Sequence, residues 1–511
     1  MSDNSFDALN LIPWPRSIRK LDGELLLSSI RAISIDVEAD TARGAAELLA
    51  AHLKLSITKI NGNEIAVRFT APSSLLAPEA YWLKIGTDGI SLSASTAVGY
   101  FYGVQTLLQI IGSESALPAL EIEDEPRFRW RGLMLDVSRH LMPGDGILRL
   151  LDCMAIHKLN SFHWHLTDDQ GWRVESKRFP KLTEIGAYRR GADGELTFGL
   201  AEKELPHLGT YGGFYTLEDI RRVVNHATKL QINVVPEIEM PGHATAALAA
   251  YPYLACTDGP FETAVRTGIF KNVYCAGNDQ TIAFLETVLE EVLPLFPGEY
   301  VHVGGDECLK DNWKTCPKCQ ARIRNEGLKD EHELQSWVIQ RMSRFLAQRG
   351  KKLIGWDEIL EGGLAPGATV MSWRGMKGGI EAAKAGRDVV MSPRNPCYLD
   401  YRQAADGEPK AIGEAVNSLE MAYAFNPIPT ELSADQAKHV LGLQGNVWTE
   451  YMPNMRHVEY MIWPRAAALA EVAWTPAEQR NWESFSRRVK VNEKRLADLG
   501  SNYRPVAPAA V

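Results

Sequence analysis

The chain has 511 residues, of which 23% are charged, and its formal net charge is -9. That length allows two or three domains with a large core, and the acidic balance argues against nucleic acid or an anionic membrane surface as a partner. No run approaches the roughly 18 apolar residues of a membrane-spanning helix. Residues 1–10 lack the basic start and apolar stretch of a secretory signal, so we expect a cytoplasmic protein unless an export signal has been removed.

Seven cysteines are present, so at least one thiol has no disulfide partner within the chain. Cys316 and Cys319 form a C-x-x-C motif, but a zinc site needs two more ligands and no second C-x-x-C supplies them. The sequence therefore favours no bound metal. Cys256 and Cys275 flank a loop and would be able to pair in an oxidising compartment, and the sequence leaves open whether they do.

The first part of the chain alternates short β-rich stretches with helical patterns. Strand-like segments occur at 32–36 and 64–69, and helical periodicity occurs at 41–53 and 97–111. This pattern is typical of a small α+β domain. A polar, proline-containing break at 124–127 separates this part from the rest of the chain, so we predict an N-terminal domain over 1–125 and a second domain over 126–511.

From Trp130 onward, strand-like apolar runs alternate with helical stretches. The runs are 132–136, 161–166, 232–238, 300–304, 352–356, 369–373, 388–391 and 440–445. Eight such units predict an α/β fold, a closed (β/α)8 or TIM barrel. Helical patterns at 460–473 and 482–499 are expected to close the barrel and cover its outer face.

Polar and tryptophan side chains come directly after the predicted strands. In this fold the carboxyl ends of the strands carry the chemistry, so these side chains should converge on one mouth of the barrel. A single Asp-Glu pair is more often a helix cap, and a single tryptophan is as often core packing. The whole set instead indicates an aromatic-walled pocket with several acids. Its members are Asp168, Glu237, His243, Asp306, Glu307, Trp356, Asp357, Trp373, Tyr398, Trp448 and Glu450.

Six motifs in order give this chain a resemblance to a known family. They are the segments 131–140, 162–172, 236–243, 304–307, 355–358 and 445–450. With them, the chain resembles glycoside hydrolase family 20, the β-N-acetylhexosaminidases. The resemblance covers nearly the whole length, including the small domain that precedes the barrel in these enzymes.

The resemblance implies hydrolysis that removes terminal β-linked N-acetylglucosamine, and often N-acetylgalactosamine, with retention at the anomeric carbon. The nucleophile would be the substrate's own 2-acetamido oxygen, which forms an oxazolinium intermediate. The family uses no metal and no cofactor. The partner would be an oligosaccharide that ends in an N-acetylhexosamine. The sequence does not fix the leaving group, the choice between the two sugars or the oligomeric state, and it assigns no role to an insertion at 191–213 on the expected aglycone side.

The adjacent acids Asp306 and Glu307 are the predicted catalytic pair. Glu307 would protonate the departing oxygen, with a pKa raised by apolar walls and by the charge of Asp306. Asp306 would hold the acetamido N–H and stabilise the oxazolinium. If the strand pleat persists to the tip, the two side chains should point in opposite directions.

Other residues are predicted to bind the sugar. Tyr398 and Asp400 match the family pair that holds the amide oxygen, and Asp136 would either orient Arg139 or cap a helix. His163 and His165 share one face of a strand and are expected to support the barrel interior. Three indoles that end different strands are expected to enclose the acetamido methyl group: Trp356, Trp373 and Trp448. His243 would hydrogen-bond toward the catalytic acids, with Asp168 and Glu237 as further members of that network. By family match, Arg139 and Glu450 bind ring hydroxyls.

Three competing interpretations remain at this stage. A His-x-His strand with scattered acids also suits a metal-dependent hydrolase. The fold would also suit a sugar-binding module that has lost catalysis, although the intact Asp306-Glu307 pair argues against it. The third is a retaining glycosidase in which an enzyme carboxylate is the nucleophile.

Overall fold

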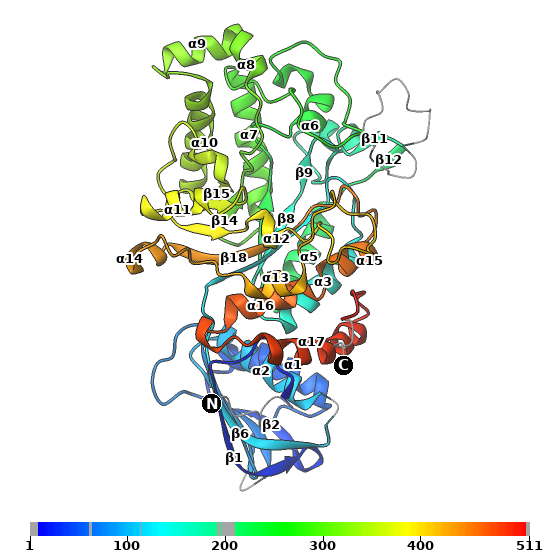
Figure 1. Ribbon diagram of the computed structural model, residues 1–511, viewed down its shortest axis with the longest axis vertical. Coiled ribbons are helices and arrows are strands. Elements are labelled where there is room, and N and C mark those ends of the chain that lie inside the picture. Colours follow the sequence, from blue (N-terminus) through cyan, green and yellow to red (C-terminus); the bar gives the residue numbers. More distant parts are fainter. Residues whose placement is uncertain (1–8, 61–63, 113, 192–195, 197–209, 507–511) are drawn as a thin grey trace.

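The computed structural model describes residues 9–60, 64–112, 114–191, 196 and 210–506. Figure 1 shows a sheet-containing N-terminal part at one end and a barrel at the other. Most of the insertion predicted at 191–213 lies outside the described residues; its flanks, β11 (Tyr188–Arg190) and β12 (Thr210–Gly212), pair in antiparallel fashion. None of the helices in the described ranges combines the length and apolar character needed to span a bilayer.

The N-terminal part is a six-stranded mixed sheet with two helices on it. The strand order is β1-β6-β4-β5-β3-β2, with β3 parallel to both of its neighbours. The strands are β1 (Ser17–Leu26), β2 (Ala32–Ile35), β3 (Ala66–Thr70), β4 (Tyr81–Gly86), β5 (Gly89–Ala94) and β6 (Ala116–Asp124). Helix α2 (Ala97–Ile111) packs on β4 and β5, and α1 (Ala39–Leu53) packs on α2. The predicted α+β fold is confirmed.

The second part is a closed barrel of parallel strands in the order β13-β14-β15-β16-β17-β18-β7-β8. Each strand begins and ends within two residues of its predicted position, which confirms the (β/α)8 fold. Each strand alternates with helices because parallel neighbours require a crossover connection. The strands are β7 (Trp130–Asp136), β8 (Ser161–His165), β13 (Asn233–Glu237), β14 (Tyr300–His302), β15 (Lys352–Trp356), β16 (Thr369–Ser372), β17 (Val389–Met391) and β18 (Val440–Val447).

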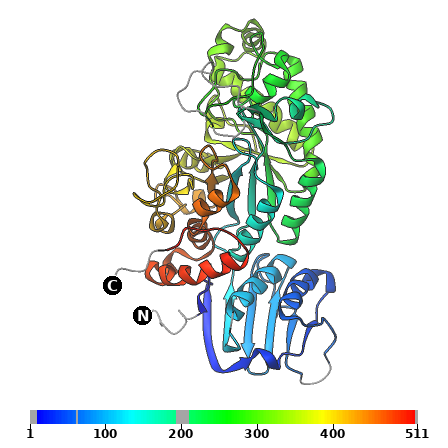
Figure 2. The same ribbon diagram turned by 90° about the vertical axis from the view of Figure 1, so that its right-hand side faces the viewer.

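Helices cover the outside of the barrel, as Figures 1 and 2 show. They include α3 (Gly144–Ile156), α5 (Leu217–Lys229), α7 (Asp279–Val292), α10 (Glu331–Ala347), α11 (Lys377–Lys384) and α16 (Arg465–Trp474). The connecting segments hold further elements. These are β9 (Thr167–Asp168), β10 (Gly171–Trp172), α4 (Lys181–Glu184), α6 (Thr245–Ala250), α8 (Asp311–Thr315), α9 (Pro317–Asn325), α12 (Arg394–Cys397), α13 (Leu419–Ala424), α14 (Ala434–Ala437) and α15 (Met455–Ile462).

The C-terminal helices differ from the prediction in two ways. The single helix expected at 460–473 is two helices, α15 and α16, because Pro464 lacks the N–H that a continuous helix needs. Helix α17 (Trp482–Asp498) has nearly the predicted bounds, but it lies between the barrel and the N-terminal sheet instead of covering the barrel (Figure 1). There Arg495 Nη1 donates to the carbonyl of Asn10 at 2.8 Å, and Arg488 pairs with Glu471 of α16 at 2.7 Å.

A buried carboxylate joins the two parts of the chain. Asp124, at the end of β6, accepts hydrogen bonds from Tyr81 of the sheet at 2.6 Å and from Trp474 of the barrel at 2.9 Å. The ammonium group of Lys158, which precedes β8, lies 3.1 Å from the same carboxylate. Both charged groups are almost completely buried. Such a pair is costly to break because one buried charge would remain uncompensated.

We therefore expect Asp124→Ala to lower the free energy of unfolding by about 3–5 kcal/mol. The control is Arg19→Ala, which removes an exposed ion pair with Glu121 and should cost less than about 1 kcal/mol. Denaturant unfolding followed by tryptophan fluorescence measures both. Equal losses of unfolding free energy in the two variants would contradict the role of the buried pair of Asp124 and Lys158 in joining the sheet to the barrel.

Candidate active site

The predicted site residues meet at the carboxyl end of the barrel. All eight strands contribute, because parallel strands place their carboxyl ends at the same rim. Each residue contacts or electrostatically influences at least one other member of the set. In barrel order they are Arg139 after β7, Asp168 after β8, Glu237 and His243 at and after β13, Asp306 and Glu307 after β14, Trp356 on β15, Trp373 after β16, Tyr398 and Asp400 after β17, and Trp448 and Glu450 after β18.

The loop that carries the acid pair leaves the strand geometry early. Strand β14 ends at His302, and Gly304, Gly305 and Glu307 have φ values of 68°, 95° and 46°. A Cβ atom at Gly304 would lie 1.6 Å from Glu239 Oε2, so only glycine fits there. The expectation that the pleat continues and turns the two acids apart is therefore wrong.

Both acids instead approach one imidazole. His243 Nε2 lies 3.4 Å from Asp306 Oδ2 and 3.7 Å from Glu307 Oε2. On its other side, His243 Nδ1 donates toward Asp168 Oδ1 and Asp169 Oδ2, each at 3.1 Å. Burial opposes the charged form, but the charges of Asp168 and Asp306 raise the pKa of His243 well above its usual value. His243 is thus an imidazolium that faces carboxylates on both sides.

The two acids have different surroundings. Burial, and then the charge of Asp306, raise the pKa of Glu307, while its side chain keeps 27% of its surface exposed toward the mouth. Asp306 is more buried, and its Oδ1 has no hydrogen-bond partner among the described residues. Glu307 is thereby favoured as a proton donor, whereas Asp306 offers one free acceptor oxygen.

Glu237, the last residue of β13, lies at the base of the site in the barrel interior. Its carboxylate accepts hydrogen bonds from His163 Nε2 at 2.9 Å, from His165 Nδ1, and from Trp356 Nε1 at 2.8 Å. His302 Nδ1 lies 2.7 Å away. Burial opposes ionisation, but the surrounding imidazoles hold the pKa of Glu237 well below its usual range. His163 and His165 thus point into the barrel interior, as their spacing on one strand predicts.

Four groups of histidine and acid side chains in this part of the described chain have ligand atoms within 4.8 Å of one another, as a metal would require. Many of these side chains, however, already bond to one another, although both carboxyl oxygens of Glu239 and Nε2 of His302 have no partner among the described residues. His165 uses both ring nitrogens, on Glu237 and on Asp168 at 2.9 Å, and Arg139 lies 2.9 Å from Asp168. The adjacent guanidinium and imidazolium would repel a cation. The arrangement favours a hydrogen-bonded network over the metal-dependent interpretation.

Arg139 sits between several carboxylates. Its guanidinium lies 3.2 Å from Asp136 Oδ2 and 3.7 Å from Glu450 Oε1, and its Nε donates to Gln170 at 2.8 Å. Asp136 also accepts the backbone N–H groups of residues 138, 139 and 449, and helix α3 begins only at residue 144. Of the two roles predicted for Asp136, orientation of Arg139 is observed and helix capping is not.

Aromatic side chains line the other side. Tyr398 stacks with Trp373 at a ring distance of 6.2 Å and an interplanar angle of 12°, and it lies 6.3 Å from Trp448. Trp356 lies 5.7 Å from Trp448 and is only 1% exposed. It therefore supports Trp448 from below, whereas Trp448 is partly exposed at the mouth.

Asp400 lies beside this wall. It is 2% exposed, and neither of its carboxyl oxygens has a hydrogen-bond partner within the described ranges. Burial and the charge of Glu450 raise its pKa well above the usual range, and burial and Asp400 in turn raise the pKa of Tyr398. Both groups therefore remain protonated and can act as hydrogen-bond donors.

The sequence assigned no role to two acids next to Asp306. Burial, and then the charge of Asp306, raise the pKa of Glu358 to about 8 and that of Glu239 well above its usual value. Glu358 Oε2 also accepts the indole N–H of Trp373 at 2.9 Å. Both acids lie inside the family motifs 236–243 and 355–358, which is the one signal that the sequence offers for them.

Glu358 gives a test of this electrostatic arrangement. Because its pKa is higher in the folded state than in the unfolded chain, its stabilising contribution is present below about pH 4 and is lost as pH rises toward 8. We expect Tm of the wild type to fall between pH 5 and pH 8 by several degrees more than Tm of Glu358→Gln. The control is Glu361→Gln, a partly exposed acid in the next turn. Parallel pH curves for wild type and Glu358→Gln would contradict the assignment.

Comparisons with known proteins agree with this site. Residues 128–477 match the model for the catalytic domain of glycosyl hydrolase family 20, and residues 8–125 match domain 2 of the same family. A β-hexosaminidase of Porphyromonas gingivalis is 44% identical over 98% of this chain, which spans 65% of that protein, and one of Vibrio furnissii is 37% identical over 90% of the chain and 76% of that protein.

Solved structures show the same likeness. An exo β-N-acetylglucosaminidase of Vibrio harveyi in complex with N-acetylglucosamine has a TM-score of 0.85 at 33% identity, covering 97% of this chain and 78% of that one. A β-N-acetylhexosaminidase of Bacteroides fragilis has a TM-score of 0.82 at 31% identity, covering 97% of both chains. The chain belongs to glycosyl hydrolase family 20.

Proposed function

We propose that this chain is an exo-acting, retaining β-N-acetylhexosaminidase. It removes terminal β-linked N-acetylglucosamine, with N-acetylgalactosamine as a second candidate sugar, by substrate-assisted catalysis through an oxazolinium. The observation that carries the proposal is that Asp306 and Glu307 approach one imidazolium at the mouth of an aromatic-walled barrel. The relatives named as β-hexosaminidases and the neighbouring structure that holds N-acetylglucosamine support the same activity.

Glu307 acts as the general acid. Its raised pKa keeps it protonated, and its partly exposed side chain can reach an oxygen that leaves toward solvent. It transfers its proton to the glycosidic oxygen as the bond to the anomeric carbon breaks. The resulting carboxylate then accepts a proton from the water that opens the oxazolinium, which returns Glu307 to its starting state.

Asp306 positions the nucleophile. Its free Oδ1 accepts the acetamido N–H, which turns the amide oxygen toward the anomeric carbon. Its negative charge then stabilises the oxazolinium, while Tyr398 donates a hydrogen bond to the same amide oxygen. Because the nucleophile is tethered to the sugar, its effective molarity can reach about 10⁵–10⁸ M, whereas the general acid adds about 10²–10⁴-fold. Proximity is therefore the larger contribution.

The remaining residues hold the sugar ring. Trp373, Tyr398 and Trp448 enclose the acetamido methyl group and lie against the pyranose face. Arg139, whose guanidinium lies over the Trp448 ring 5.1 Å from its centroid, and Glu450 bind ring hydroxyls, and Asp168 keeps the guanidinium in place. In this assignment Glu307 serves the leaving oxygen and Asp306 holds the acetamido N–H, which favours the acetamido oxygen as nucleophile over an enzyme group.

We expect Glu307→Gln to lower kcat/KM on chitobiose-like substrates by about 10²–10⁴-fold, because a poor leaving group needs the proton. For an aryl N-acetylglucosaminide whose leaving group is an acidic phenol, kcat/KM of this variant should fall much less. The wild type should lose activity as pH rises through the raised pKa of Glu307, and the variant should lack this decline. Near-wild-type turnover of chitobiose by the variant would refute the role of Glu307.

Asp306→Asn should lower kcat/KM by at least about 10²-fold on both substrates, because the amide cannot stabilise a positive oxazolinium. The two variants thus separate the roles, since only the loss caused by Glu307→Gln depends on the leaving group. Steady-state kinetics with paired aryl and chitobiose substrates gives the comparison. A leaving-group dependence for Asp306→Asn equal to that of Glu307→Gln would contradict the division of roles.

A further inference from the structure

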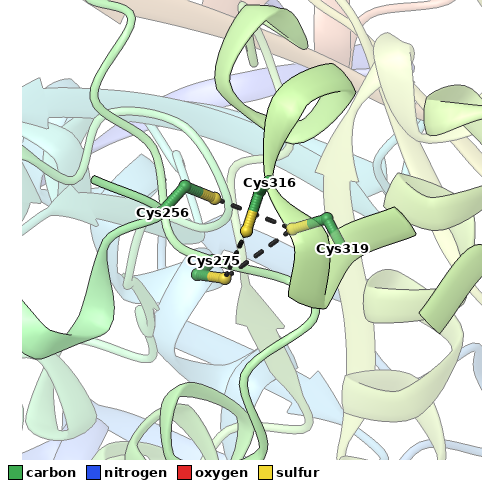
Figure 3. Close-up of side chains that lie close together, drawn as sticks. All are labelled: Cys256, Cys275, Cys316 and Cys319. Atoms are coloured by element: carbon green, nitrogen blue, oxygen red, sulfur yellow. Dashed lines mark hydrogen bonds between the residues drawn. The ribbon is translucent and has the colours of Figure 1, made fainter. Parts of the chain in front are cut away.

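Four cysteines from two separate loops gather at one place (Figure 3). Cys256 and Cys275 lie in the segment between β13 and α7, whereas Cys316 and Cys319 lie at the start of α9. All four sulfurs lie within 4.8 Å of one another. The C-x-x-C motif therefore finds its two missing partners as single cysteines rather than as a second motif, which the sequence alone did not indicate.

The spacing of the sulfurs suits one tetrahedral ion. Cys319 Sγ lies 3.6 Å from Cys256 Sγ and 3.7 Å from Cys275 Sγ, which in turn lies 3.7 Å from Cys316 Sγ. Zinc bound by thiolates at about 2.3 Å requires sulfurs about 3.8 Å apart at the corners of a tetrahedron. A disulfide would need about 2.0 Å, and all four thiols are free.

The surrounding backbone holds the four sulfurs in this arrangement. A Cβ atom at Gly277 would lie 2.1 Å from the carbonyl carbon of Lys318, so the two loops touch directly and only glycine fits. The N–H of Gly277 donates to the sulfur of Cys275, as backbone groups around thiolate ligands often do. The indole of Trp313 donates to the carbonyl of Tyr274 at 2.9 Å, a second bond between the loops.

We propose that Cys256, Cys275, Cys316 and Cys319 form a structural zinc site. Four protein ligands complete the tetrahedron and leave no position for water or substrate, so the ion would stabilise the fold without taking part in hydrolysis. A tetrahedral set of four sulfurs selects zinc or iron among the common metals. We choose zinc because it is the usual ion of closed structural sites made by four cysteines.

The site would fasten two loops of the candidate active site. The loop after β13 carries His243, and the loop after β14 carries Asp306 and Glu307. The distances from His243 to Asp306 and Glu307 depend on how these two loops lie relative to one another. The loops also pack closely at Gly242, where an added Cβ atom would lie 2.9 Å from the carbonyl oxygen of Asp306. A zinc ion bridging the same loops would fix that distance through its bonds to the four sulfurs.

The first test is metal content. The full-length protein, expressed with zinc in the medium and purified without chelator under reducing conditions, should contain about one zinc per chain by elemental mass spectrometry. Titration of thiols with a mercurial should release that zinc to a metal indicator. Replacement by Co²⁺ should give thiolate-to-cobalt charge-transfer bands and the visible bands of a tetrahedral site. No bound metal, stoichiometric iron, or a mass lower by the four hydrogens of two disulfides would overturn the proposal.

Two cysteine variants, one inside the cluster and one outside it, test which residues bind the zinc. Cys319→Ser should lose at least about half of the bound zinc and lower Tm by about 5–10 °C. Cys153→Ala, a buried thiol in α3 outside the cluster, should keep one zinc per chain. Equal zinc content in the two variants would overturn the assignment. Since the metal content of the wild type is measured independently of activity, failure of the zinc site and failure of the proposed hydrolysis remain distinguishable.

Discussion

The charged imidazole of His243 is the interaction on which the site depends. It joins the barrel interior to the reacting pair, because its two nitrogens face Asp168 on one side and Asp306 with Glu307 on the other. Behind Asp168, His165 continues the chain to Glu237. Charges of opposite sign therefore alternate from the floor of the barrel to its mouth, and each buried charge has a neighbour that compensates it.

Neutral acids are as important as the charged ones. Burial and nearby anions raise the pKa of Glu239, Glu358 and Asp400, which favours the neutral form of these carboxyls around Asp306. Negative charge is thereby concentrated at one position, next to the place where a positive intermediate would form. Burial, and then the same anion, raise the pKa of Glu307, so one charge both stabilises the intermediate and favours the protonated acid.

The sequence predicted the barrel well because buried parallel strands are continuous apolar runs of characteristic length, and the polar residues at their ends mark the active rim. It failed where structure depends on contacts between distant segments. The left-handed turn through Gly304 and Glu307 follows from the carboxylate of Glu239 above it, and the position of α17 follows from contacts with the N-terminal sheet. Likewise, the C-x-x-C motif of Cys316 and Cys319 does not indicate that thiols of another loop lie beside it.

A crystal structure with a bound thiazoline mimic of the cyclised intermediate tests the central claim most directly. The account predicts that the ring nitrogen of the thiazoline lies within hydrogen-bond distance of Asp306 Oδ1, that its methyl group lies between Trp373 and Trp448, and that the carboxyl of Glu307 stands on the side from which the leaving group departs. A thiazoline bound away from Asp306, or a sugar bonded covalently to any carboxylate of the enzyme, would contradict it.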